Sequence, residues 1–247
     1  MPSIYLSPST QEYNPYITGG TEEYYMNLIA DAMEPYLDAS GIEYARNTPG
    51  MTAASSIAAS NAGNYDFHLA LHSNAASGDR SGRVRGCEVY FYPSSRNGRR
   101  GADIIANNLK AIYPLPELVR AATTTRIGEV SKTKAPSVLI EFAYHDNYED
   151  ADWIAENIGE IAENVSLSLT EYFGIPFVSP GNTRTGTVRT QGRNLLIRET
   201  PSFEGEVIGS VPNGRRIYIL ESYGEWYFID YNGLEGYVYS NYVTVNS

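Results

Sequence analysis

The stretch Asp66–Ala75, DFHLALHSNA, decides the fold of this chain. Its apolar residues alternate with His68, Ala70 and His72, a pattern that predicts a short buried β-strand. The polar residues after His72 end the apolar run and open a loop. An imidazole at the carboxyl end of a core strand is well placed for a functional site, because open α/β sheets collect ligands at that edge. The other candidate residues are therefore sought around His72.

Predicted strands and helices alternate on both sides of this stretch. This order predicts an α/β domain with a mostly parallel or mixed sheet and helices on both faces. The strands are expected at 3–6, 42–46, 67–72, 88–92 and 138–142, and the helices at 21–39, 52–62, 99–112 and 150–173.

The pattern changes after Gly174, where the run IPFVSPGNTRTG is rich in Pro, Gly, Ser and Thr. Such a composition predicts a linker, which we place at 176–186 between a first domain at 1–175 and a second at 187–247. The second domain contains only short apolar runs such as LLIR, RIYIL and WYFIDY, separated by turn residues. This spacing predicts a small all-β barrel.

Composition excludes several classes of protein. The formal net charge of -11 disfavours nucleic acid as a partner, because phosphate binding needs clustered Lys and Arg. The single cysteine, Cys87, rules out an internal disulfide and a cysteine-based metal cage. The start MPSIYLSPS has neither a basic segment nor a long apolar one, so no secretory leader is predicted, and no apolar run predicts membrane insertion.

Three side chains that can bind a metal ion or accept a proton lie at the ends of predicted elements: Glu23, His72 and Glu141. One histidine and two glutamates suffice for a zinc hydrolase, which needs side chains that bind the ion and a free carboxylate to take a proton from water. Spacing alone leaves structural roles open for both glutamates. A carboxylate that closes the apolar run SVLI is harder to explain structurally, because an unpaired buried charge is costly.

Three further polar residues lie near these acceptors. His68 is four residues before His72, about 13 Å along a strand, so the two cannot easily bind one ion and His68 is expected to be structural. His145, in the loop after Glu141, is a candidate proton partner or substrate donor, with a surface role as the alternative. Asn74 is a candidate to orient substrate, with a loop-capping role as the alternative.

The order of several motifs resembles one enzyme family. IYLSPSTQ, TEEYYMNLIADAM, RNTP, DFHLALHSNA, GCEVYFYP and APSVLIEFAYHDN are similar to segments of the zinc-dependent N-acetylmuramoyl-L-alanine amidases of the amidase-3 family, over about residues 1–175. These enzymes cut the bond between muramic acid and the stem peptide of peptidoglycan. The tail, with NLLIRETPS and WYFIDYNGLEGYVYSNYV, resembles a bacterial SH3-like cell-wall-binding module over 187–247. Both resemblances imply peptidoglycan as the partner.

Carried over by this resemblance, Glu23 is the zinc carboxylate, His72 a zinc imidazole and Glu141 the catalytic base. The family usually has another zinc histidine after the first strand, where this chain has Thr10 followed by Gln11. An amide oxygen is a poorer zinc ligand than an imidazole, so a site of Gln11, Glu23 and His72 should bind metal more weakly. Three alternatives follow: a functional variant completed by Gln11 or Asn14, a different metal, or a catalytically inactive binder.

The resemblance also implies where the protein acts. We expect action at the bacterial cell wall, either as an endolysin that is cytoplasmic before its release or as an autolysin. Two rival interpretations stay open. One is a non-catalytic peptidoglycan-binding protein, and the other is a generic α/β domain in which the three acceptors do not converge.

Overall fold

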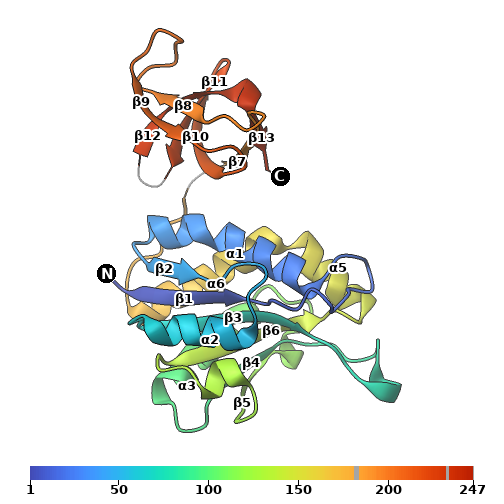
Figure 1. Ribbon diagram of the computed structural model, residues 1–247. Coiled ribbons are helices and arrows are strands. Elements are labelled where there is room, and N and C mark those ends of the chain that lie inside the picture. The colour runs from blue at the N-terminus through green and yellow to red at the C-terminus, as the bar shows by residue number, and fades with distance from the viewer. Residues whose placement is uncertain (181–183, 232–233, 247) are drawn as a thin grey trace. The chain divides into compact units, whose positions relative to one another are not determined.

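A computed structural model describes residues 1–180, 184–231 and 234–246 of the chain (Figure 1). The chain divides into two compact units, residues 1–179 and 180–247. Each unit has a hydrophobic core of its own.

The first unit is built on a six-stranded sheet with the strand order β2-β1-β3-β6-β4-β5. Neighbouring strands are parallel except for the β4–β6 pair, which is antiparallel, so the sheet is mixed. The predicted α/β sheet is confirmed. The strands are β1 (Ser3–Pro8), β2 (Glu43–Arg46), β3 (Phe67–Asn74), β4 (Glu88–Phe91), β5 (Arg120–Thr123) and β6 (Ser137–Tyr144).

Helices cover both faces of this sheet, and Figure 1 shows α1 and α2 on opposite sides of it. Helices α1, α3, α5 and α6 supply residues to the main core, whereas α4 covers the small cluster of Ala70, Val130 and Leu139 on the other face. The helices are α1 (Glu22–Ala39), α2 (Ala53–Ala62), α3 (Arg96–Leu109), α4 (Gly128–Ser131), α5 (Tyr148–Glu156) and α6 (Ile158–Phe173), with short 3₁₀ turns at η1 (Gly78–Arg80) and η2 (Pro116–Leu118).

The alternation along β3 decides which side chains reach the functional face. Phe67, Leu69 and Leu71 belong to the main core under α1, α3 and α6. Because successive side chains of a strand point to opposite faces, His68 and His72 lie on the face of α2 and α4. The same rule places Glu141 on that face, since it is the register partner of His72 on β6.

Two features of this unit differ from the prediction. The helix expected at 150–173 is two helices, because Asn157 ends α5 and its side-chain amide donates to the Trp153 carbonyl at 2.7 Å. Asparagine is suited to such a break, since its side chain competes for helical backbone groups. The segment between Arg120 and Ser131 forms β5 and α4, for which no element was predicted.

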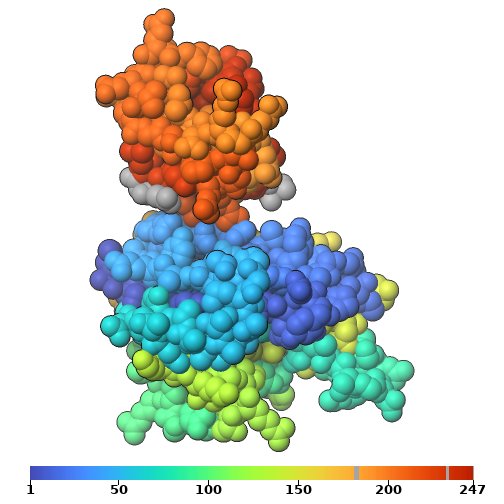
Figure 2. Space-filling model, in the orientation of Figure 1, coloured from blue at the N-terminus to red at the C-terminus, as the bar shows by residue number. Residues whose placement is uncertain are grey.

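The segment 75–86, which follows β3 and contains η1, projects from the first unit in Figures 1 and 2. It is tied to the loop after β6 by one carboxylate. Asp146 accepts from the backbone N–H of Ala76 at 3.1 Å and from that of Gly82 at 2.8 Å. Asn147 donates to the Gly82 carbonyl at 2.9 Å. These contacts hold the segment at the edge of the sheet where β3 and β6 end.

The second unit is an all-antiparallel sheet of seven strands in the order β13-β7-β10-β11-β12-β8-β9. This agrees with the predicted SH3-like module. The first strand begins at Arg184, inside the predicted linker 176–186, of which residues 181–183 lie outside the described residues. The strands are β7 (Arg184–Val188), β8 (Leu195–Arg198), β9 (Val207–Val211), β10 (Arg216–Tyr223), β11 (Trp226–Tyr231), β12 (Leu234–Tyr239) and β13 (Val243–Val245), with η3 (Ser240–Tyr242) before the last.

Aliphatic side chains fill the core of this second unit, among them Val188, Ile197, Ile219, Ile229 and Val238. In the described parts of the whole chain, no helix combines the length and the apolar character that crossing a bilayer requires.

Candidate functional site

The loop between β1 and α1 brings its polar side chains to the end of β3. The Ser9 N–H donates to the Leu71 carbonyl at 2.9 Å, which fixes the start of the loop beside β3. At the other end, the Glu22 N–H donates to the Asn14 carbonyl at 2.9 Å, and the Thr21 hydroxyl caps α1 by accepting from the Tyr24 N–H at 3.2 Å. Glu22 is therefore the first helical residue, where the helix dipole stabilises a carboxylate.

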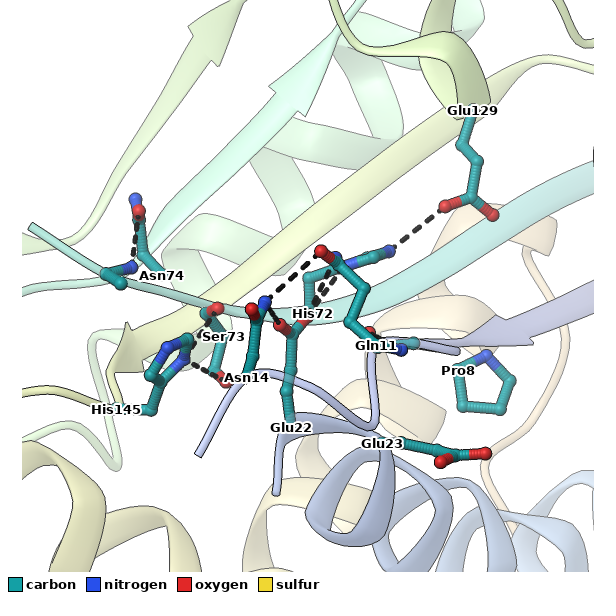
Figure 3. A network of polar contacts seen from close by, with 12 residues as sticks. Pro8, Gln11, Asn14, Glu22, Glu23, His72, Ser73, Asn74, Glu129 and His145 are labelled. Atoms are coloured by element: carbon teal, nitrogen blue, oxygen red, sulfur yellow. Dashed lines mark hydrogen bonds and ion pairs between the residues drawn. The ribbon is translucent and has the colours of Figure 1, made fainter. Parts of the chain in front are cut away.

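His72 meets this loop through its Nδ1 atom (Figure 3). The Nδ1 atom lies 2.8 Å from Glu22 Oε1 and 3.3 Å from Gln11 Nε2. Asn14 Nδ2 donates to the other oxygen of Glu22 at 2.6 Å and to Gln11 Oε1 at 3.2 Å. One imidazole, one carboxylate and two amides thus converge, and two of the predicted ligands, His72 and Gln11, are brought together.

Glu23, the carboxylate predicted to accompany them, does not take part in this cluster. Figure 3 shows its side chain pointing away from His72, on the helical position after Glu22. Consecutive residues of an α-helix are separated by about 100° around the axis, so Glu22 and Glu23 cannot face the same point. Glu22, which is 1% exposed, occupies the place that was predicted for Glu23.

A second carboxylate reaches His72 from the opposite side. Glu129 of α4 places Oε2 3.0 Å from His72 Nε2 and accepts from the Ser7 hydroxyl at 2.5 Å through Oε1. The same Oε1 lies 3.4 Å from His68 Nε2, which has no hydrogen-bond partner by geometry. His68 Nδ1 is 2.9 Å from the Ser60 hydroxyl, so this histidine is buried in the scaffold, as expected.

Sequence reasoning did not find Glu129. It lies in a helix of four residues with no apolar period, outside every motif quoted above. Only its tertiary contact with β3 distinguishes it from the other glutamates of the chain.

The two carboxylates determine the electrostatics of His72. Burial disfavours the imidazolium ion, but the hydrogen bonds to Glu129 and Glu22 outweigh it and raise the pKa of His72 well above its usual value. Burial also opposes ionisation of Glu22, yet its contacts with His72 keep the pKa of Glu22 below its ordinary value.

Glu141 of β6 lies next to His72 of β3. The sequence predicts both residues near the ends of their strands. A cavity of about 380 Å³ is lined by His72, Glu129 and Glu141 together with Thr10 and Gln11. Burial, together with the surrounding carboxylates, raises the pKa of Glu141 to about 8. Its Oε2 atom is buried without a hydrogen-bond partner. A larger depression of about 530 Å³, lined by residues within 92–97 and 130–137, contains none of these five residues.

The two remaining predicted residues lie beyond His72. Asn74 Oδ1 accepts from the Ala75 N–H at 2.8 Å, which is the loop-capping contact that was its alternative role. His145 is 5% exposed, with Nδ1 3.0 Å from both the carbonyl and the hydroxyl oxygen of Ser73, and its ring stacks on Tyr16. Burial lowers the pKa of His145, so this imidazole favours the neutral form.

The cluster around His72 meets the needs of a metal ion only when an amide is included. Within the described residues, no group of three or more His, Cys, Asp and Glu side chains forms a metal site. Three groups are nevertheless close together if the amide of Gln11 is counted beside His72 and Glu22. The Nε2 atom of that amide faces His72, so the amide would have to turn for its Oε1 atom, which accepts from Asn14, to bind an ion. Two buried carboxylates, Glu22 and Glu129, flank this imidazole, and the carboxyl group of Glu141 lines the cavity beside it; a divalent cation would favour the ionised form of all three. The set of ligands therefore fits zinc. The neutral amide of Gln11 takes the position that a histidine or a carboxylate usually holds.

The first unit is thus a mixed α/β domain with carboxyl groups and an imidazole in a cavity at its strand ends, and a small β module follows it. Residues 9–171 match the family model described as N-acetylmuramoyl-L-alanine amidase, and residues 193–244 match that of the bacterial SH3 domain. The chain belongs to the N-acetylmuramoyl-L-alanine amidase family of the amidase-3 type.

One curated relative is YrvJ of Bacillus subtilis (strain 168), provisionally named as an N-acetylmuramoyl-L-alanine amidase. It is 31% identical over 153 residues, which are 61% of this chain and 27% of the relative. The match thus spans about a quarter of that longer protein.

Solved structures of similar fold include two amidases. The N-acetylmuramoyl-L-alanine amidase AmiC2 of Nostoc punctiforme has a TM-score of 0.61 at 19% identity, over 70% of this chain and 97% of that one. The catalytic domain of the amidase CwlV from Paenibacillus polymyxa var. colistinus has a TM-score of 0.61 at 15% identity, over 71% and 100%. At these identities the similarity establishes the shared fold.

Proposed function

We propose that this protein hydrolyses peptidoglycan at the amide bond between N-acetylmuramic acid and the L-alanine of the stem peptide. The single observation that carries the proposal is the position of Glu141. Its carboxyl group, one oxygen of which is buried without a hydrogen-bond partner, lines the same cavity as His72 and Gln11. Family membership supplies the bond and the substrate class.

His72, Glu22 and Gln11 are the residues that would hold zinc in this proposal, with Asn14 beside them. When bound, zinc would polarise the scissile carbonyl and acidify a water molecule. Glu22 replaces Glu23 in this set because only Glu22 reaches His72. The amide ligand should lower the affinity for zinc relative to a site with a second imidazole.

Glu141 is the proposed general base. Its carboxylate takes a proton from the water that attacks the amide carbon and gives it to the nitrogen of the departing alanine. A base is most effective when its pKa is near the working pH, and burial moves the pKa of Glu141 towards neutrality. Asn74 and His145 remain proposed substrate contacts, although the contacts they make here are with their own loops.

The test is digestion of purified peptidoglycan in the presence of zinc, with mass spectrometry of the products. We expect release of stem peptides with free alanine amino termini. The variant Glu141→Gln should lose about 10²- to 10⁴-fold in turnover, because it removes the proton acceptor. It should retain the fold and zinc binding, and Glu149→Gln, at an exposed position nearby, should leave turnover unchanged.

The competing proposal is an inactive peptidoglycan-binding protein, favoured by the absence of a histidine at Thr10. Binding to cell walls without release of amino groups, at any zinc concentration, would support it. Full activity of the Glu141→Gln variant would instead exclude Glu141 as the base.

We further propose that the second unit binds the cell wall and holds the first unit near its substrate. An aromatic cluster supports this proposal: the ring of Phe203, 63% exposed, lies 5.0 Å from that of Trp226 and 4.9 Å from that of Tyr239. Exposed apolar groups of this kind often mark binding surfaces.

A further inference from the structure

Glu129 has no part in the ligand set or the proton transfer proposed above, yet it is 5% exposed and contacts both histidines of β3. A buried carboxylate is costly unless it is paired, so its position needs a reason. The geometry around His72 supplies one.

The two ring nitrogens of His72 face different groups. Nδ1 faces Glu22 and Gln11, and Nε2 faces Glu129 (Figure 3). A neutral imidazole carries its proton on one nitrogen only, and a metal binds the other. The partner of one nitrogen therefore decides which side of the ring can bind a cation.

Glu129 is an acceptor at both oxygens. Oε1 accepts from the Ser7 hydroxyl at 2.5 Å, and Oε2 lies 3.0 Å from His72 Nε2. For that second contact to be a hydrogen bond, Nε2 must carry the hydrogen. The 2.8 Å contact of Nδ1 with Glu22 Oε1 needs a hydrogen in the same way. A cation held by Glu22 and Gln11 would take the place of that hydrogen, while Glu129 keeps the one on Nε2.

We propose that Glu129 is a positioning residue that holds the Nε2–H of His72 and thereby directs Nδ1 to the metal. This inference rests on the proposed zinc-dependent function and adds the residue that orients its single imidazole ligand. Carboxylate partners of metal-bound histidines typically change metal affinity by about 10- to 100-fold. In a site with only one imidazole, the orientation of that ring decides whether the ligand set is complete.

The surroundings hold Glu129 in this position. The Ser7 hydroxyl is 2.6 Å from the Ser56 hydroxyl of α2, and Asn47 Nδ2 donates to the Pro8 carbonyl at 2.9 Å beside them. His68 lies on the other side, with Nδ1 held by Ser60 of α2. Elements β1, β3 and α2 thus fix the carboxylate of α4.

An ion on the opposite side, between Nε2 and Glu129, is the alternative geometry. The available metal ligands argue against an ion on the Nε2 side. Glu129 Oε1 is already taken by Ser7, whereas the Nδ1 side offers a carboxylate and the amides of Gln11 and Asn14.

The first test measures zinc affinity by competition with a chelator. Glu129→Gln, which keeps the shape and removes the charge, should weaken zinc binding about 10- to 100-fold. Glu88→Gln is the matched control, because Glu88 is another buried carboxylate of this sheet, bound to Tyr90 and Arg120 rather than to His72. The zinc affinity of the Glu88→Gln variant should stay within about threefold of the wild-type value. A loss of about 10-fold or more is expected only when the changed residue is a direct partner of a metal ligand.

The second test identifies the metal-bound nitrogen by long-range ¹H–¹⁵N NMR of the zinc-loaded protein. The chain has three histidines, so the spectrum can be assigned. We expect His72 with hydrogen on Nε2 and metal on Nδ1. Measured on the wild-type chain alone, this result tests the proposal even if Glu129→Gln does not fold.

Metal on Nε2, or an unchanged affinity in Glu129→Gln, would overturn the inference. These outcomes are separate from failure of the proposed function. Zinc on Nδ1 without hydrolysis of peptidoglycan would overturn the amidase activity and support the role of Glu129. Hydrolysis with a zinc affinity that does not depend on Glu129 would overturn only the inference. A wild-type chain that binds no zinc would overturn both.

Discussion

At the scale of residues, Glu22 and Glu23 show how one helical step separates a carboxylate that contacts His72 from one that does not. The sequence TEE offers both carboxylates at the start of α1, and the resemblance alone favours Glu23. The distinction depends on which residue is first in the helix, and that depends on the cap at Thr21 and on the Asn14 carbonyl. Helix boundaries are the least predictable part of an element, so this choice needed the structure.

Ala143, next to the end of β6, has a left-handed backbone with φ of 55°. The β3–β6 pairing shifts register between His72 and Asn74, and such irregularities re-aim side chains near sites. A left-handed conformation is strained for residues with a β-carbon and worst for β-branched ones.

We expect Ala143→Val to lower the free energy of unfolding by about 2 kcal/mol or more, because it combines this strain with overpacking at a position that is 0% exposed. Ala143→Gly should stay within about 1 kcal/mol of wild type. Chemical denaturation measures both. Equal stability of the Val and Gly variants would show that φ at this position is not a constraint.

At the scale of elements, a single carboxylate of α5 joins three parts of the first unit. Asp150 accepts from Tyr113 at 2.7 Å, from Arg85 Nε at 2.7 Å and from the Tyr144 N–H at 3.0 Å. It also accepts from the Gly86 N–H at 3.2 Å. The residue is 0% exposed, so its charge depends entirely on these donors.

Asp150→Asn should therefore destabilise the protein by about 3 kcal/mol, because the new amide group faces donors and the charge that pairs with Arg85 is lost. Asp152→Asn, two residues on at an exposed position, is the control and should change stability by less than about 0.5 kcal/mol. Thermal and urea unfolding would measure the difference. A small effect at Asp150 would mean that water replaces its partners.

The elements themselves were predictable where an apolar pattern was long or sharply bounded. β3 was predicted from alternation and β6 from an apolar run, whereas α1 was predicted from its cap and apolar face and α2 from its alanine content. β5 and α4 have four residues each, too few for a period to show. Since α4 carries Glu129, the unpredicted part of the fold is also the unpredicted part of the site.

At the scale of the whole molecule, the two units have separate cores. Removing residues 180–247 should leave the thermal midpoint of the first unit within a few degrees, because that unit has a hydrophobic core of its own. Hydrolysis of soluble peptidoglycan fragments should also remain.

Binding to insoluble cell walls should fall when residues 180–247 are removed, since the attachment through the second unit is lost. Co-sedimentation with purified walls measures this. Unchanged sedimentation of the shortened chain would contradict the binding role of the second unit and leave the amidase proposal intact.

The antiparallel direction of β4 has a practical consequence for the connection 75–87. β3 ends and β4 begins at the same edge of the sheet, so this connection needs no crossover and stays at the edge where β3 and β6 end. Lengthening a loop whose ends are already close costs little conformational entropy, about 0.6 kcal/mol for each doubling. Loop exchange between relatives at this position should therefore leave the sheet and the residues around His72 as they are.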